Sequence, residues 1–235
     1  MGQIQEVYPG IHLMITEMLE KYLHDHSRQK EPVLEWLERE THYRCVHPRM
    51  LSGEPLGSFL SMLVKMIRPR NILEIGTFTG YSSICMGRGL SPEGRIDTIE
   101  IFDEHNDLII EAFRRSGLES QIHLHTGNAL EVIPGLRENG YSCQLAYIDG
   151  NKREYCDYYR EVKKVLEPGG YIIADNVLWD GKVADPKYKD PQTAGLRAYN
   201  ILVLKDPEVT TVLLPLGDGL SICRKDGPAS GNPTG

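Results

Sequence analysis

Two aspartates and an asparagine stand where apolar strands are expected to end. Asp149 closes the run LAYIDG, and Asp175 with Asn176 closes the run GYIIADNV. Since neighbouring parallel strands lie about 4.8 Å apart, these side chains should converge at one edge of a sheet. Two carboxylates so close would repel each other unless a cation lay between them. Carboxylate and amide oxygens suit Mg²⁺, Ca²⁺ or Mn²⁺, so the sequence predicts a divalent-cation site, with Mg²⁺ as the first choice.

A lysine follows the first of these aspartates at short range. Lys152 lies three residues after Asp149, in an expected loop, where its ammonium group could face the same pocket. We therefore take Lys152 as a candidate proton acceptor and Asp149 as its catalytic partner. The alternative interpretation makes the acids helix caps and the lysine a surface charge, which is the commoner role of Asp-Gly and Asp-Asn turns. The expected convergence of these residues beside a glycine loop favours the interpretation as a catalytic site.

That glycine loop is EIGTFTG, residues 74–80, which follows an apolar strand and opens a helix. Open α/β sheets bind ligands at such places. Dinucleotide-binding folds use G-x-G-x-x-G there, whereas this loop has G-x-x-x-G preceded by an acid. Glu74 would repel phosphate but suits an ammonium group, and Gly76 lets an adenosine lie against the backbone. The loop therefore favours S-adenosylmethionine over NAD.

A second acid strengthens this interpretation. Glu100 ends the next predicted strand, twenty residues beyond Gly80, where a carboxylate can accept hydrogen bonds from both ribose hydroxyls. Alone, the GxxxG loop is as often an ordinary strand-to-helix turn, and Glu100 a solvated strand end. Together the two features favour cofactor binding.

Short apolar runs alternate with helical stretches from Asn71 onward. The predicted strands are NILEIG, RIDTIEIF, QIHLHTG, CQLAYIDG and GYIIADNV, and the helical crossovers are 79–90, 104–116, 129–138 and 154–167. A helix near 193–204 precedes VTTVLLPLG and GLSICRK, which flank a turn at 217–219 and predict a closing hairpin. This alternation predicts a parallel sheet covered by helices.

Helical spacing of apolar residues dominates the first seventy residues, over 11–26, 33–41 and 55–67. We expect one domain over 1–225, with a helical cap (1–70) on an α/β core (71–225). Residues 226–235 are rich in Gly, Pro and Ser and predict a flexible tail. The predicted fold class is α/β: a doubly wound, seven-stranded, Rossmann-like sheet with an antiparallel edge hairpin and a helical N-terminal cap.

Composition excludes several classes. The 26 Lys and Arg against 33 Asp and Glu give a net charge of −7, which disfavours nucleic acid as a partner. The longest apolar stretch, 59–67, is too short to span a membrane. The N-terminal MGQIQEVYPG resembles neither a signal peptide nor a myristoylation signal, so the expected location is the cytoplasm.

The cysteines and histidines predict no further site. The five cysteines form no CxxC pair, and we expect mostly buried, reduced thiols. The eight histidines lack the spacing of metal ligands and are interpreted as structural or solvent-facing. A GxSxG nucleophile motif is absent, which makes a hydrolase a weak alternative.

With these residues assembled, the chain from Arg49 to Arg224 resembles the class I S-adenosylmethionine-dependent, cation-dependent O-methyltransferases, which include the caffeoyl-CoA and catechol O-methyltransferases. The segments that carry the resemblance are LEIGTFTGYS, IDGNK followed by Tyr155 and Tyr158, LEPGGYIIADNVLWDGKV and LPLGDGLSICRK. The resemblance implies a methyltransferase sheet and assembly as a homodimer.

The resemblance also implies roles for individual residues. Asp149, Asp175 and Asn176 would bind the divalent cation, and Lys152 would help to deprotonate the acceptor hydroxyl. Trp179 and Tyr199 would lie on the acceptor side. The implied contacts of S-adenosylmethionine are Met50, Ser52, Glu74, Gly76, Ser82, Glu100, Asn128, Ala129 and Asp149.

The expected function is methyl transfer to a hydroxyl of a metal-chelated, catechol-like or phenolic small molecule, without a membrane partner. An alternative within the same family is methylation of a hydroxyuridine in tRNA, for which Lys152, Arg153, Lys163 and Lys164 could form a local basic surface. An NAD-binding oxidoreductase is disfavoured by Glu74 and the missing glycine. A non-catalytic adenosine-binding protein would not need the acid pair and its lysine.

Overall fold

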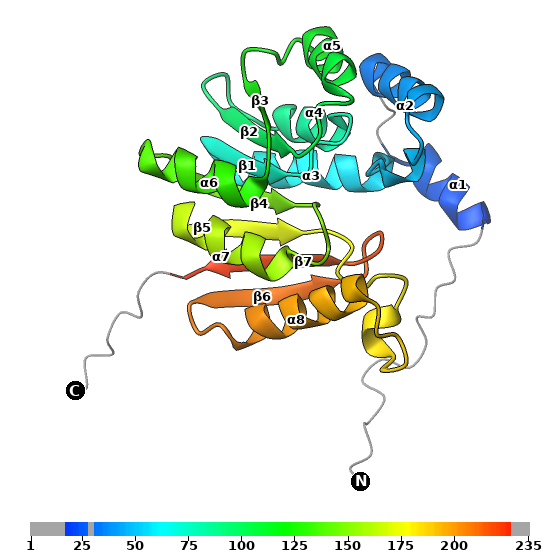
Figure 1. Cartoon of the computed structure of the whole chain (residues 1–235). Helices are drawn as coiled ribbons and strands as arrows, with labels where there is room; N and C mark the ends of the chain where they lie inside the picture. Colours follow the sequence, from blue (N-terminus) through cyan, green and yellow to red (C-terminus); the bar gives the residue numbers. More distant parts are fainter. Residues whose placement is uncertain (1–16, 28–30, 227–235) are drawn as a thin grey trace.

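Seven strands form one mixed sheet in the described residues, 17–27 and 31–226 of this computed structural model (Figure 1). The strands are β1 (Asn71–Ile75), β2 (Arg95–Glu100), β3 (Ile122–Thr126), β4 (Cys143–Ile148), β5 (Leu166–Ala174), β6 (Val209–Leu214) and β7 (Leu220–Lys225). Their order is β3-β2-β1-β4-β5-β7-β6. The first five are parallel, whereas β7 is antiparallel to both of its neighbours, which confirms the doubly wound sheet with an antiparallel edge hairpin.

Eight α-helices accompany the sheet in the same part of the chain. They are α1 (Glu17–Asp25), α2 (Pro32–Arg44), α3 (Glu54–Ile67), α4 (Tyr81–Gly87), α5 (Asn106–Ser116), α6 (Ala129–Glu138), α7 (Tyr155–Val165) and α8 (Pro191–Lys205). Short 3₁₀ turns occur at Pro48–Met50 and Lys182–Ala184. The helices of the crossovers lie where the sequence predicts them, because each strand ends at a polar or glycine-containing turn.

The two faces of the sheet bury two separate hydrophobic cores, because side chains alternate along each strand. Ile72 and Ile96 face a core that α2, α3, α4 and α5 complete. Leu73 and Ile99 face the opposite core, built with α6, α7 and α8. The helical N-terminal segment thus covers one face of the sheet rather than forming a core of its own.

Several predicted boundaries change. Residues 11–16 of the first predicted helix lie outside the described residues, and α1 begins at Glu17. Strand β5 begins at Leu166, before Pro168 and the two glycines, so the predicted start at Gly170 was late. Leu166 pairs with Cys143, and pairing resumes only at Tyr171 opposite Leu145, because the register shifts there.

The hairpin reaches one residue further than predicted. Asp226, the first residue of the predicted flexible tail, donates its backbone N–H to Glu208 O at 2.8 Å, and its carboxylate accepts from the Thr210 hydroxyl at 2.8 Å. The rest of that tail, 227–235, lies outside the described residues. Over 17–27 and 31–226 no helix has the length and apolarity that a bilayer crossing requires. None of the five cysteines, all of which lie within the described residues, forms a disulfide, and four of them are buried, as predicted.

Candidate active site

A cavity of about 1600 Å³ runs along the carboxyl ends of β1, β2, β4 and β5. This edge includes the point between β1 and β4 where the strand order reverses, which is where open α/β sheets bind ligands. Residues of the segment 47–58, which includes the first turn of α3, line the cavity as well. The predicted site residues that line the cavity are Met50, Ser52, Gly76, Ser82, Glu100, Ala129, Asp149, Lys152, Asp175, Asn176 and Trp179.

Three predicted site residues do not line this cavity. Glu74 is fully buried behind Ser82. Asn128 caps α6, its Oδ1 accepting the Leu130 N–H at 2.9 Å, while its neighbour Ala129 lines the cavity. Tyr199 is fully buried as well and packs edge-to-face on Tyr155, with ring centroids 5.5 Å apart. Tyr199 therefore supports the site from behind instead of facing an acceptor.

The glycine loop after β1 approaches the end of β4 very closely. Gly76 has a φ of +97°, and a Cβ atom there would lie 2.8 Å from the carbonyl carbon of Asp149 and closer still to its oxygen. Only glycine fits this close approach and this backbone conformation. The loop is closed by Gly80 N–H donating to Thr77 O at 2.8 Å.

We expect Gly76→Ala to lower the free energy of unfolding by about 2 kcal/mol or more beyond the cost of the backbone conformation alone, because the new methyl group displaces the end of β4. Gly140→Ala is the matched control, since Gly140 also has a positive φ, +78°, but open space around it; its cost should be about 1–2 kcal/mol. Urea unfolding of both variants measures the difference. Equal losses would contradict the close approach.

Both carboxylate oxygens of Glu74 accept hydrogen bonds from serines of the following helix. Ser82 Oγ donates to Oε1 at 2.6 Å, and Ser83 Oγ donates to Oε2. Burial raises the pKa of this carboxyl to about 7, although the hydroxyls of Ser82, Ser83 and Thr98 act in the opposite direction. Since Ser82 lines the cavity, its hydroxyl links the buried acid to the cavity wall.

Glu74 should make stability pH-dependent. Its pKa is 4.5 ordinarily and about 7 in the folded chain. The folded state therefore holds a proton that the unfolded state has released, so the free energy of unfolding falls as pH rises from 4.5 to 7. Glu74→Gln should reduce this fall by about 3 kcal/mol at most. Urea unfolding in EDTA across this range tests it, with exposed Glu119→Gln as control; parallel curves for wild type and Glu74→Gln would contradict it.

Glu100 joins the glycine loop to the end of β2. Its Oε2 accepts the Phe78 N–H at 2.8 Å, and its Oε1 accepts the Ile101 N–H at 2.9 Å. The carboxylate is thereby fixed in orientation at the cavity wall while keeping lone pairs for further donors. This geometry suits a ligand with two adjacent hydroxyl groups.

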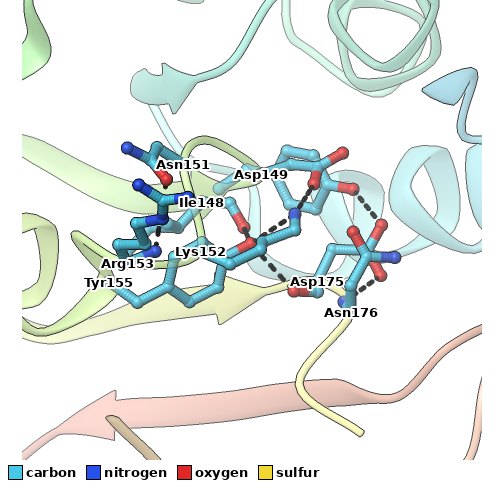
Figure 2. A network of polar contacts seen from close by, with 9 residues as sticks. Ile148, Asp149, Asn151, Lys152, Arg153, Tyr155, Asp175 and Asn176 are labelled. Carbon is cyan, nitrogen blue, oxygen red and sulfur yellow. Dashed lines mark hydrogen bonds and ion pairs between the residues drawn. The ribbon is translucent and has the colours of Figure 1, made fainter. Parts of the chain in front are cut away.

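The acid pair and its lysine form one polar network at the ends of β4 and β5 (Figure 2). Lys152 Nζ donates to Asp149 Oδ1 at 2.5 Å and to the Tyr155 hydroxyl at 2.8 Å. The Tyr155 hydroxyl in turn donates to the backbone oxygen of Asp175 at 2.9 Å. Tyr147, from within β4, donates to Asp175 Oδ2 at 3.0 Å. Two buried tyrosines thus fix the positions of Lys152 and Asp175.

The electrostatics of this network fit a hard cation. Burial, and next the charge of Asp149, raise the pKa of the Asp175 carboxyl to about 6. Asn176, at φ +57°, adds an amide that lines the same cavity. Over the described ranges no group of three or more His, Cys, Asp and Glu converges, so a cation here would have two carboxylates and one amide from the protein. Such an all-oxygen set suits Mg²⁺ with open positions for other oxygens.

Some cavity residues escaped the sequence analysis. Phe78, Ile101 and Phe102 give the wall beside Glu100 an apolar character. Asp180 and Asp218 line the other end, near Trp179. The available signals were the phenylalanine inside the glycine loop, the apolar pair directly after Glu100, and the Asp between two glycines at 217–219, which was interpreted only as a turn.

Comparison with known proteins assigns the class. Residues 24–226 match the O-methyltransferase family. A caffeoyl-CoA O-methyltransferase of Petunia hybrida is 32% identical over 228 residues, covering 91% of this chain and 92% of that protein. A catechol O-methyltransferase of Niastella koreensis is 35% identical over 161 residues, or 68% of this chain and 73% of that protein.

A solved structure agrees with this assignment. The O-methyltransferase from Bacillus cereus, determined in complex with SAH, has a TM-score of 0.83 and 30% sequence identity, covering 89% of this chain and 97% of that one. The chain belongs to the O-methyltransferase family.

Proposed function

We propose that this chain is an S-adenosylmethionine-dependent, divalent-cation-dependent O-methyltransferase that methylates one hydroxyl of a catechol-like or phenolic small molecule. The observation that carries the proposal is the single cavity that joins the glycine loop and Glu100 to the set of Asp149, Lys152, Asp175 and Asn176. The relatives named as catechol and caffeoyl-CoA O-methyltransferases support the choice of acceptor.

The glycine-loop end of the cavity is assigned to the cofactor. Gly76 allows a ligand to lie against the backbone, and Ser82 offers a hydroxyl oriented by Glu74. The Glu100 carboxylate is held in place to accept hydrogen bonds from ribose hydroxyls. Met50 and Ser52, from the segment before α3, line the same cavity and are assigned to this end as well.

The other end is assigned to the acceptor. When bound, S-adenosylmethionine supplies an electrophilic sulfonium methyl, and a divalent cation supplies Lewis acidity that lowers the pKa of the acceptor hydroxyl. Asp149, Asp175 and Asn176 are the protein groups that would hold that cation. Trp179 offers a flat apolar surface for an aromatic ring.

We assign Lys152 to the removal of the proton from the acceptor hydroxyl. Its Nζ is fixed by Asp149 and the Tyr155 hydroxyl, and its side chain is only 12% exposed. From this position it stabilises the oxygen that loses the proton, or accepts that proton. S-adenosylmethionine bound beside this oxygen would supply the methyl group, and the electron pair of the broken carbon–sulfur bond would stay on sulfur. Holding the acceptor in a fixed orientation lowers the activation free energy further.

A small molecule is favoured over tRNA by the pairing of the basic residues. Lys163 lies 2.5 Å from Asp206 and 2.7 Å from Glu208, and Lys164 lies 2.5 Å from Glu161. These acids offset the local positive charge on which phosphate binding would depend.

One assay tests the proposal. Purified protein is incubated with methyl-labelled S-adenosylmethionine and, separately, a catechol, a phenolic CoA thioester and bulk tRNA, each with Mg²⁺ or with EDTA. We expect label on the catechol or the thioester with Mg²⁺ and a loss of transfer in EDTA. Label on tRNA alone would reject the small-molecule acceptor, and transfer unchanged by EDTA would reject the cation.

A further inference from the structure

The loop after β5 has backbone dihedral angles that residues other than glycine rarely adopt. Asn176 has a φ of +57°, Trp179 and Asp180 each have +51°, and Gly181 has +74°. Asparagine tolerates this left-handed region, but a bulky residue such as tryptophan does so only rarely. Such conformations persist where neighbouring structure holds them. Whatever holds this loop therefore decides where Asn176 and Trp179 point.

The turn of the β6–β7 hairpin makes three hydrogen bonds that hold it, in addition to one from Asn200 Nδ2 of α8 to Val177 O at 3.0 Å. Val177 N–H donates to Gly219 O at 3.0 Å. Leu178 N–H donates to the backbone oxygen of Asp218 at 2.9 Å. The Asp180 N–H donates to the carboxylate of the same Asp218, to Oδ1, at 2.6 Å. Asp218 is thus bonded to the loop twice, once on each side of Trp179.

The turn is also packed directly against the loop. Gly219 has a φ of +91°, and a Cβ atom there would lie 2.8 Å from the backbone nitrogen and the Cβ of Leu178. The loop and the turn lie side by side because β7 pairs with β5. Trp179, Asp180 and Asp218 all line the same end of the cavity.

We infer that Asp218 is a positioning residue for methyl transfer: its carboxylate holds the Trp179–Asp180 turn so that Asn176 and Trp179 face the acceptor. The inference rests on the proposed function in assigning this end of the cavity to the acceptor. The glycine loop follows β1, three strands from β7 in the order β1-β4-β5-β7. Loss of the Asp218 carboxylate should therefore affect the acceptor and spare the cofactor.

The kinetic test compares Asp218→Ala with wild type. The acceptor KM should rise and kcat should fall, lowering kcat/KM about tenfold or more, because one charge-assisted hydrogen bond no longer holds the loop. The dissociation constant for S-adenosylhomocysteine, measured by calorimetry, should stay within about twofold of wild type, the spread allowed for a site left untouched. Asp218→Asn keeps an oxygen at the Oδ1 position and should restore most of the activity.

Asp226→Ala is the matched control. Asp226 sits at the opposite end of the same hairpin, and on substitution its carboxylate loses its contacts to Thr210 and Arg224. It should leave both the acceptor kinetics and the cofactor affinity unchanged. A similar acceptor defect in this control would show that the hairpin acts through stability alone and would overturn the inference.

A second readout follows the loop without turnover. The chain has two tryptophans, so Trp36→Phe leaves Trp179 as the only indole. In that background Asp218→Ala should increase quenching of Trp179 emission by acrylamide, and Asp218→Asn should not. Unchanged quenching together with unchanged acceptor kcat/KM would overturn the inference. If no acceptor is methylated by wild type, the proposed function fails, whereas the quenching comparison still decides the role of Asp218.

Discussion

Asp175→Ala should lower kcat/KM for the preferred acceptor about a thousandfold, which corresponds to about 4 kcal/mol of transition-state stabilisation. The substitution removes one of the two carboxylates that would hold the cation, at a position that is only 3% exposed. Steady-state kinetics at saturating Mg²⁺ measure the loss. The described residues contain no group of three or more acids, histidines or cysteines that could hold the cation instead.

The loss should come from the cation and not from the fold. Mg²⁺ should raise the thermal unfolding midpoint of wild type, since a ligand that binds only the native state stabilises it, and should not raise that of Asp175→Ala. In EDTA the thermal unfolding midpoint of Asp175→Ala should lie close to that of wild type. The variant loses the hydrogen bond from Tyr147, but it also loses the repulsion between the two carboxylates. Asp157→Ala, which removes an exposed surface carboxylate, is the control. Wild-type activity in Asp175→Ala would refute the assignment.

Lys152→Met should lower kcat about a hundredfold or more, the usual loss when a group that manages a proton is removed. Methionine keeps much of the side-chain volume but cannot donate to Asp149 or to the Tyr155 hydroxyl. The affinity for S-adenosylhomocysteine should change little, because Glu100 and Gly76 are untouched.

Two further variants sharpen this prediction. Lys152→Arg keeps the positive charge, but a planar guanidinium differs in shape from the ammonium group and cannot accept a proton, so activity should stay low. Lys164→Met removes an exposed lysine paired with Glu161 and should behave as wild type. Full activity of Lys152→Met at neutral pH would remove Lys152 from the mechanism.

Features that depend on local sequence could be predicted. The ends of β4 and β5 follow from apolar runs that stop at Asp149 and Asp175, and the parallel arrangement then brings these acids together. The start of α6 at Ala129 follows from Asn128, whose side chain caps the helix. The resemblance to the family led to the prediction that Asn128 contacts the cofactor, although its side chain is used for the cap.

Features that depend on tertiary contacts could not be predicted from the sequence. All residues of β1 after Asn71 are buried, so the sequence does not reveal that Glu74 lies behind Ser82 and outside the cavity. Nor does it reveal that Tyr199 packs behind Tyr155. The β6–β7 turn bonds the backbone N–H groups of Val177, Leu178 and Asp180, the last of which is 38 residues away from Asp218 in sequence. These contacts exist only once β7 pairs with β5.

The most direct test of the account is transfer of a deuterated methyl group from S-adenosylmethionine to a catechol, followed by mass spectrometry. We expect one labelled methyl ether per product molecule in Mg²⁺, none in EDTA, and recovery when Mg²⁺ is added back in excess. Asp175→Ala should give no recovery. Label on the catechol at the same rate in EDTA, or an unlabelled acceptor with cofactor and Mg²⁺ both present, would contradict the account.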